Sequence, residues 1–169
     1  MRHICRRGLA PSAVALAVAL GVGVPAVPAS SPAIVVGQGI LGAKLGDTPQ
    51  QVRAHLGKPA FITAPAYDGT VEWGYPKKLM GIIGFDSTHH VYGMWTSNPK
   101  LKTNKGIGPK SSYAKFRHAY PKVKCIAGPF GPKSLECDLK SRYHGHSVIT
   151  AILFYTKALG VREIDIDFV

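Results

Sequence analysis

The hydrophobic and polar positions predict a helix at the start of the folded part of the chain. Asp47 or Thr48 can accept hydrogen bonds from the free amides of a first helical turn. Val52 and Leu56, four positions apart, lie on one face of this helix. A glycine and a proline within residues 57–59 end it, because glycine is free to turn and proline cannot continue a helix.

Beyond this helix the period of the pattern changes to two. Val71, Trp73 and Tyr75 alternate with more polar or smaller residues. Residues 81–85 are apolar, and residues 91–96 are again typical of a strand after an intervening turn. The pattern therefore predicts an antiparallel meander of three or four strands.

The same order of elements recurs in the second half. Residues 108–112 open a second helix, Phe116 and Tyr120 repeat the spacing of four, and Pro121 ends it. Strand-like segments follow at residues 135–139, 147–155 and 161–168. We predict an α+β fold of two tandem helix-plus-antiparallel-sheet modules, with three or four strands each. One continuous α+β domain whose halves are alike by chance is the alternative.

The first 29 residues have the pattern of a secretory signal peptide. Residues 1–7 carry three arginines and no acid, residues 9–24 carry no charge, and prolines and small residues follow. Cleavage is expected after Ala29 or, failing that, after Ala26. The apolar run is shorter than the roughly 20 residues of a spanning helix, so we expect a secreted protein with no membrane span after cleavage. The expected boundaries are signal peptide 1–29, flexible lead-in 30–42, first module 43–97 and second module 98–169.

Composition adds a disulfide and a strong positive charge to this picture. Cys125 and Cys137 remain after cleavage, and an even number of cysteines in an exported chain predicts a disulfide. The chain has 21 basic and 9 acidic residues, and loss of three leader arginines leaves 18 against 9, a net charge of +9. Such a charge favours anionic surroundings.

Three short runs carry a resemblance to a known family. Residues 45–52, residues 56–59 and residues 73–75 resemble the signature of the BamE-type envelope lipoproteins and of the related modules of the beta-lactamase inhibitory protein. The second half, from Gly106 to Cys137, resembles the second module of exported proteins built in tandem on that plan. The resemblance implies helices on one face of an antiparallel sheet, with the other face open and used to grip a protein partner. Unlike BamE-type proteins, this chain has no lipidation cysteine after its apolar run.

The charges separate along the second module. Alternation places five acids on the sheet face expected to bind a partner, Glu136, Asp138, Glu163, Asp165 and Asp167. The segment 98–124 contains no acid and eight basic residues that could bind an anionic surface, Lys100, Lys102, Lys105, Lys110, Lys115, Arg117, Lys122 and Lys124. The alternative is that the acids merely pair with Lys140, Arg142 and Arg162 on a solvated face.

The sequence gives little support for catalysis, metal binding or a cofactor. His144 and His146 have the spacing of two metal ligands on a strand, and His89 and His90 form a second pair, but a third ligand is missing from both motifs. No nucleophile elbow, zinc-protease motif, P-loop or dinucleotide fingerprint occurs. We therefore expect neither an enzyme nor a metal or cofactor site.

The first half also contains a group of aromatic residues, Trp73, Tyr75, Tyr92 and Trp95. Aromatic side chains are favoured at binding surfaces, but core packing is the preferred interpretation for the side of the strand that carries Trp73 and Tyr75. Lysines interleaved with aromatics also suit nucleic acid, which an exported protein rarely meets.

Together these patterns favour a secreted, non-catalytic module that docks a protein partner in the cell envelope or outside the cell through an open sheet face. One alternative is a binder of anionic cell-wall polymer or membrane surface through the lysine-rich linker and helix. Another is an inhibitor of a secreted or envelope enzyme. The sequence does not identify the partner.

Overall fold

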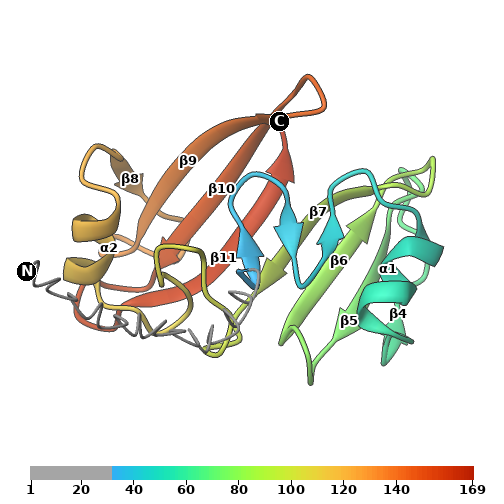
Figure 1. Ribbon diagram of the computed structural model, residues 1–169, viewed down its shortest axis with the longest axis horizontal. Helices are drawn as coiled ribbons and strands as arrows, with labels where there is room; N and C mark the ends of the chain where they lie inside the picture. Colours follow the sequence, from blue (N-terminus) through green and yellow to red (C-terminus); the bar gives the residue numbers. More distant parts are fainter. Residues whose placement is uncertain (1–31) are drawn as a thin grey trace, which may run out of the picture. The chain divides into compact units, whose positions relative to one another are not determined.

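Eight antiparallel strands form the main sheet of the protein, in the order β4-β5-β6-β7-β11-β10-β9-β8 (Figure 1). The computed structural model describes residues 32–169, so the expected signal peptide and its cleavage sites lie outside the described residues. The strands are β4 (Phe61–Ile62), β5 (Val71–Tyr75), β6 (Gly81–Phe85), β7 (Val91–Thr96), β8 (Cys125–Ala127), β9 (Leu135–Tyr143), β10 (His146–Phe154) and β11 (Val161–Phe168).

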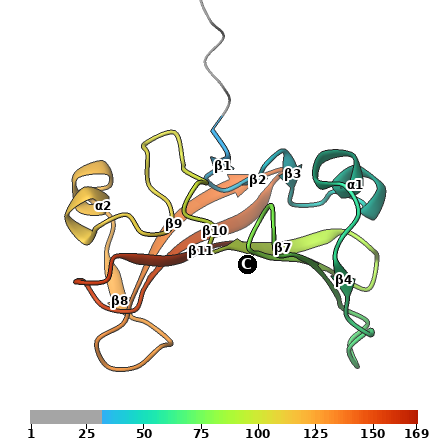
Figure 2. The same ribbon diagram turned by 90° about the horizontal axis from the view of Figure 1, so that it is seen from below.

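A second, smaller sheet and two short helices complete the described structure. The small sheet consists of β1 (Ile34–Val35), β2 (Gly39–Ile40) and β3 (Ala43–Lys44), and the helices are α1 (Pro49–Leu56) and α2 (Tyr113–Ala119). Figure 2 shows both helices and the small sheet on the same side of the main sheet. We call this side the covered face and the opposite side the open face.

The prediction of two tandem helix-plus-sheet modules is wrong. Strand β7 of the first half pairs with β11 of the second half, from Ile164 beside Thr96 to Asp167 beside Gly93. The strands of both halves therefore form one continuous sheet, and the protein is mostly β with two short helices. The pattern could not reveal this pairing, because hydrogen bonds between distant strands leave no local sign in the alternation of side chains.

Residues 32–42 of the segment expected as a flexible lead-in contain strands β1 and β2. Ile34 and Ile40 in β1 and β2 are buried, and the amide of Gly37 donates a hydrogen bond of 2.8 Å to Oγ1 of Thr150 on β10. Its small residues resembled a linker, but they allow close approach: a Cβ on Gly39 would lie 1.9 Å from the carbonyl oxygen of Ala43. The small sheet therefore packs against the covered face.

Alternation along the central strands builds the core under the helices. Ile152 on β10 and Ile164 and Ile166 on β11 are fully buried on the covered face. Trp73 and Tyr75 are also buried, with 5% and 4% of their surface exposed, which confirms their interpretation as core residues.

Both helices begin at a residue whose side chain caps their free amides, and the cap of α1 is one of the two predicted candidates. Thr48 caps α1 and forms a capping box with Gln51, in which the Thr48 amide donates to the Gln51 side chain at 2.8 Å. Ser112 caps α2 through a hydrogen bond of 3.2 Å from the amide of Lys115. Asp47, the other candidate cap, instead accepts a hydrogen bond from the amide of Lys44 at 2.8 Å.

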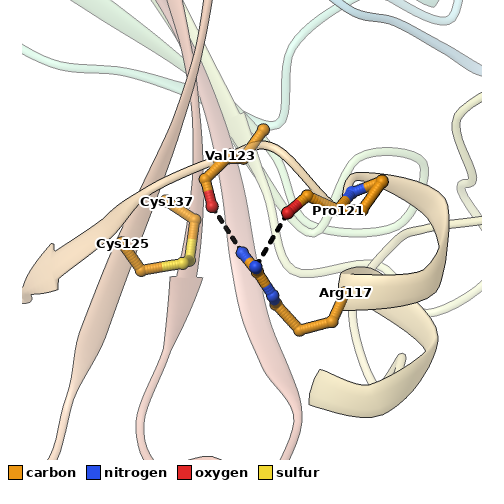
Figure 3. The surroundings of a disulfide bond; sticks show 5 residues. All are labelled: Arg117, Pro121, Val123, Cys125 and Cys137. Carbon is orange, nitrogen blue, oxygen red and sulfur yellow. Dashed lines mark hydrogen bonds between the residues drawn. A yellow bond between two sulfur atoms is a disulfide. The ribbon is translucent and has the colours of Figure 1, made fainter.

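The predicted disulfide between Cys125 and Cys137 is confirmed, and it joins β8 to β9 at paired positions of the sheet (Figure 3). The guanidinium of Arg117 in α2 donates to the carbonyl oxygens of Pro121 and Val123, which lie on the segment that leads from α2 to β8. The disulfide and this arginine therefore hold the edge of the sheet beside α2.

Candidate functional site

The acidic residues of the protein converge on the open face of the main sheet. The five acids expected on a partner-binding face, Glu136, Asp138, Glu163, Asp165 and Asp167, all lie there. The register shows how: Asp165 of β11 lies beside Ala151 of β10, and Ala151 lies beside Asp138 of β9. Strand β5 adds Glu72, which the sequence analysis did not include; Glu72 borders the same hollow as Asp165 and Asp167.

The three remaining acids have local structural roles. The Asp47 carboxylate accepts from Lys44, as described above, and the Asp68 carboxylate accepts from the amide of Thr70 at 3.0 Å. Asp86 accepts from the amides of Thr88 and His90, both at 2.9 Å. Since the chain has nine acidic residues, every acid that is not used to fix a turn lies on the open face.

Within residues 32–169 the acids of the open face have little compensation from basic groups. The ion pair found there joins Nε of Arg162 to Oε2 of Glu163 at 3.5 Å, and Lys140 and Arg142 form none in that range. One carboxylate oxygen each of Asp138 and Asp165 is buried without a hydrogen-bond partner among the described residues. The alternative prediction is that these acids pair with Lys140, Arg142 and Arg162. Among the described residues it holds only for Arg162 and Glu163.

The electrostatic consequence is a set of carboxyl groups that hold protons at unusually high pH. Burial, reinforced by the charges of Glu163, Asp167 and Glu136, raises the pKa of Asp165 to about 8. Burial alone raises the pKa of Asp167 to about 6. The pKa of Glu136 is raised by burial and by its neighbour Asp138. The centre of the face is therefore partly protonated near neutral pH.

Two shallow hollows flank β11 and share the carboxyl groups of Asp165 and Asp167. The hollow on the β7 side has a volume of about 90 Å³ and is bordered by Ile82, Tyr92 and Trp95. The hollow on the β10 side has a volume of about 260 Å³, and its other lining residues include Phe130, Glu136, Ile149, Ala151 and Leu153.

Glycines on β6 and β7 make room for two side chains that border the first hollow. A Cβ on Gly93 would lie 2.0 Å from Oδ1 of Asp167, and a Cβ on Gly84 would lie 2.7 Å from the ring of Tyr92. Real Cβ atoms do not approach so closely, so both side chains lie where only glycine permits them. Glycine inside a strand pattern signals a close approach of this kind, and Gly84 and Gly93 were the signal in the sequence that could have revealed it.

An aromatic cluster borders the second hollow. A β-bulge at Leu153 and Phe154 leaves Arg162 as an extra residue in β11. Its guanidinium lies 4.0 Å from the ring centre of Phe130 and 4.4 Å from that of Tyr155. This stack fixes the loop between β8 and β9 at the edge of the open face. No alternation in the sequence marked it, because Phe130 belongs to a loop.

The eight basic residues expected to bind an anionic surface fall into two groups. Lys102 and Lys105 donate to the carbonyl oxygens of Pro109 and Ala119 at 2.9 and 3.0 Å, and Arg117 is held as described above. Burial, with a contribution from Lys115, lowers the pKa of Lys102. The side chain of Lys105 is exposed, and so are the other five: Lys100, Lys110, Lys115, Lys122 and Lys124.

The histidine pairs lie in or beside turns. His89 and His90 occupy the turn between β6 and β7, where the ring of His90 lies 3.1 Å from the Thr88 hydroxyl. His144 lies in the turn between β9 and β10, and His146 begins β10. Across residues 32–169 no group of three or more His, Cys, Asp or Glu side chains could hold a metal ion.

Comparison with known proteins does not show a family for this chain. No family model matches it, and no curated protein matches it. Among solved structures it is similar to an extracellular protein containing a SCP domain from Bacillus anthracis str. Ames, with 13% sequence identity and a TM-score of 0.49. The similarity covers 73% of this chain, which spans 43% of the length of that protein. In the part of the chain that the structure describes, no helix is long and apolar enough to cross a membrane.

Proposed function

We propose that this protein is a secreted, non-catalytic module that docks a protein partner on the open face of its main sheet. The disulfide is compatible with an oxidising, extracytoplasmic compartment, because such bonds form and persist there. The pattern of residues 1–29 supports export to that compartment.

The environment of Asp165 is the observation that carries the proposal. A buried oxygen of this carboxyl group has no hydrogen-bond partner among the described residues. Four further acids lie on the same face, two on β11 and two on β9. Burial of a charged or polar group without a partner costs free energy. Proteins often retain such groups at functional sites, where activity requires them although they lower the stability of the fold.

The rest of the face has the mixture of residues that suits a protein interface. Apolar side chains of β10 lie between the acid-bearing strands β9 and β11. Aromatic residues border both hollows, and Trp, Tyr and Arg are the residue types most enriched at binding hot spots. A partner that supplies cations would remove the repulsion among the acids.

Affinity capture tests the proposal. The mature protein is immobilised and exposed to the extracellular and envelope fractions of the source organism. Ile149→Arg blocks the open face at a half-buried position of β10, and His118→Arg adds the same side chain at an exposed position of α2. We expect a protein that the wild type and His118→Arg retain and Ile149→Arg loses. Equal retention by all three would refute docking on this face. An activity assay of a captured enzyme, with and without the module, would show whether docking inhibits it.

A second candidate function is binding of an anionic wall polymer or membrane surface. It is favoured by the six exposed lysines of the segment 98–124, in which no acid occurs. Such binding falls steeply with ionic strength, because salt screens exposed charges. Sedimentation with purified wall polymer at low and high salt, with Lys122→Gln and Lys124→Gln as variants, distinguishes it from docking on the sheet face.

A further inference from the structure

We propose that the docking element of the partner is an extended segment with arginine or lysine at alternate positions, lying along β11 on the open face. This inference rests on the proposed function and specifies the partner that the face accepts.

Charge complementarity is the first argument. The chain is basic overall, yet six of its nine acids lie on this face, and the described residues supply one ion pair to them. Glu136 and Asp138 lie on β9, and the three acids of β11 lie across β10 from them. Lys140 and Arg142 alternate onto the same face of β9, and Arg162 lies at the edge of this face, so six acids face three basic residues. The local surface is therefore negative although the protein is positive, which favours a cationic occupant here.

The spacing of the acids is the second argument. Glu163, Asp165 and Asp167 occupy every second position of β11 and point to the same side. A strand rises about 3.3 Å per residue, so side chains on one face are about 7 Å apart. An extended segment with basic residues at every second position has the same repeat, and its cations can meet the three carboxyl groups in register.

The shape of the face is the third argument. The hollows on both sides of β11 meet at Asp165 and Asp167, so a cationic group can reach these carboxyl groups from either side. The apolar side chains of Ile149 and Leu153 form a floor for the aliphatic parts of lysine and arginine, which pack on apolar surface while the charge stays polar. The ring of Trp95 borders the hollow on the β7 side and can attract a cation through its face.

Docking of a cation should displace protons from the face. The charged groups that face Asp165 are Glu163, Asp167 and Arg162 on its own strand, Glu136 and Asp138 on β9, and Glu72 on β5, while β10 contributes apolar residues. An added cation favours the ionised carboxylates, so binding should release a proton near pH 7 and strengthen as pH rises.

Titration calorimetry with a defined peptide tests this inference. The probe is a short peptide in which arginine alternates with serine, and its counterpart has glutamate in place of arginine. Measurements at pH 7 in two buffers of different ionisation enthalpy count the protons released. We expect binding of the arginine peptide alone, release of close to one proton per peptide, and an affinity about tenfold higher at pH 7 than at pH 6.

Variants locate the binding. Asp165→Asn with Asp167→Asn should weaken binding of the arginine peptide at least tenfold and abolish proton release. Asp86→Asn removes one charge from a turn on which asparagine can form the same hydrogen bonds, so its affinity should match the wild type. Thermal unfolding verifies that each variant is folded.

Failure of this inference differs from failure of the proposed function. If Ile149→Arg abolishes capture of a partner but the arginine peptide does not bind, or binds the double variant equally well, the extended basic segment is refuted and docking on the face stands. If capture is also insensitive to Ile149→Arg, both are refuted.

Discussion

Replacement of Asp165 by asparagine should make the protein more stable, which is the reverse of the usual effect of a point substitution. Asparagine keeps the size and shape of the side chain and removes the charge. The pKa of Asp165 lies at about 8 against an ordinary value of 3.8. Between these two values the native state holds a proton that the unfolded chain releases, so stability falls as pH rises through this range.

The size of the effect follows from the same two values. Each pH unit corresponds to about 1.4 kcal/mol, so the full difference gives an upper bound of about 6 kcal/mol at pH 8 and above. Asp165 still borders two hollows that are open to solvent, and water there lowers the penalty. We therefore expect a gain of about 2–3 kcal/mol at pH 8 and little change at pH 4.

Urea unfolding of the wild type and Asp165→Asn, followed by tryptophan fluorescence at pH 4, 5, 7 and 8, measures this gain. Asp86→Asn is the contrasting control: although partial burial acts to raise its pKa, hydrogen bonds from His90 and Thr88 lower it, so this substitution should not stabilise the protein. Equal stability of wild type and Asp165→Asn at pH 8, or a wild-type stability that does not fall between pH 5 and 8, would refute the reasoning.

Three further predictions follow from the packing. Serine at both Cys125 and Cys137 should lower the free energy of unfolding by about 3 kcal/mol, measured by urea unfolding, because a loop of 12 residues opens in the unfolded chain. Thr150→Val should cost about 1–3 kcal/mol, since it removes the acceptor that fastens the small sheet to β10; limited proteolysis should then cut near the start of the folded chain first. Gly93→Ala should displace the Asp167 carboxyl group at little cost in stability, because the atom in the way is the end of a side chain that can rotate, and a crystal structure with an unmoved Asp167 would contradict this account.

Local features were predictable from the sequence where local physics decides them. The caps of both helices, the alternation of the strands and the burial of Trp73 and Tyr75 follow from side-chain chemistry and period. The shared orientation of the acids of β11 follows from the same alternation.

Pairing between distant strands was not predictable in this way. The junction of β7 and β11 joins the two halves, and neither strand carries a signal of its neighbour. The small sheet was missed because its glycines and small residues have the composition of a linker. The hollow at Gly93 and the stack of Arg162 on Phe130 also depend on contacts across the sheet, which no single segment encodes.

The central claim is that the carboxyl group of Asp165 has a buried oxygen without a hydrogen-bond partner among the described residues and binds a cationic group of the partner on the open face. Carbon-detected NMR of its carboxyl group, titrated with pH in the free protein and with the arginine peptide bound, tests this claim most directly. The account predicts a pKa of about 8 in the free protein and a clear decrease on binding. A carboxyl group that titrates near its ordinary value, with the same midpoint in both samples, would contradict it.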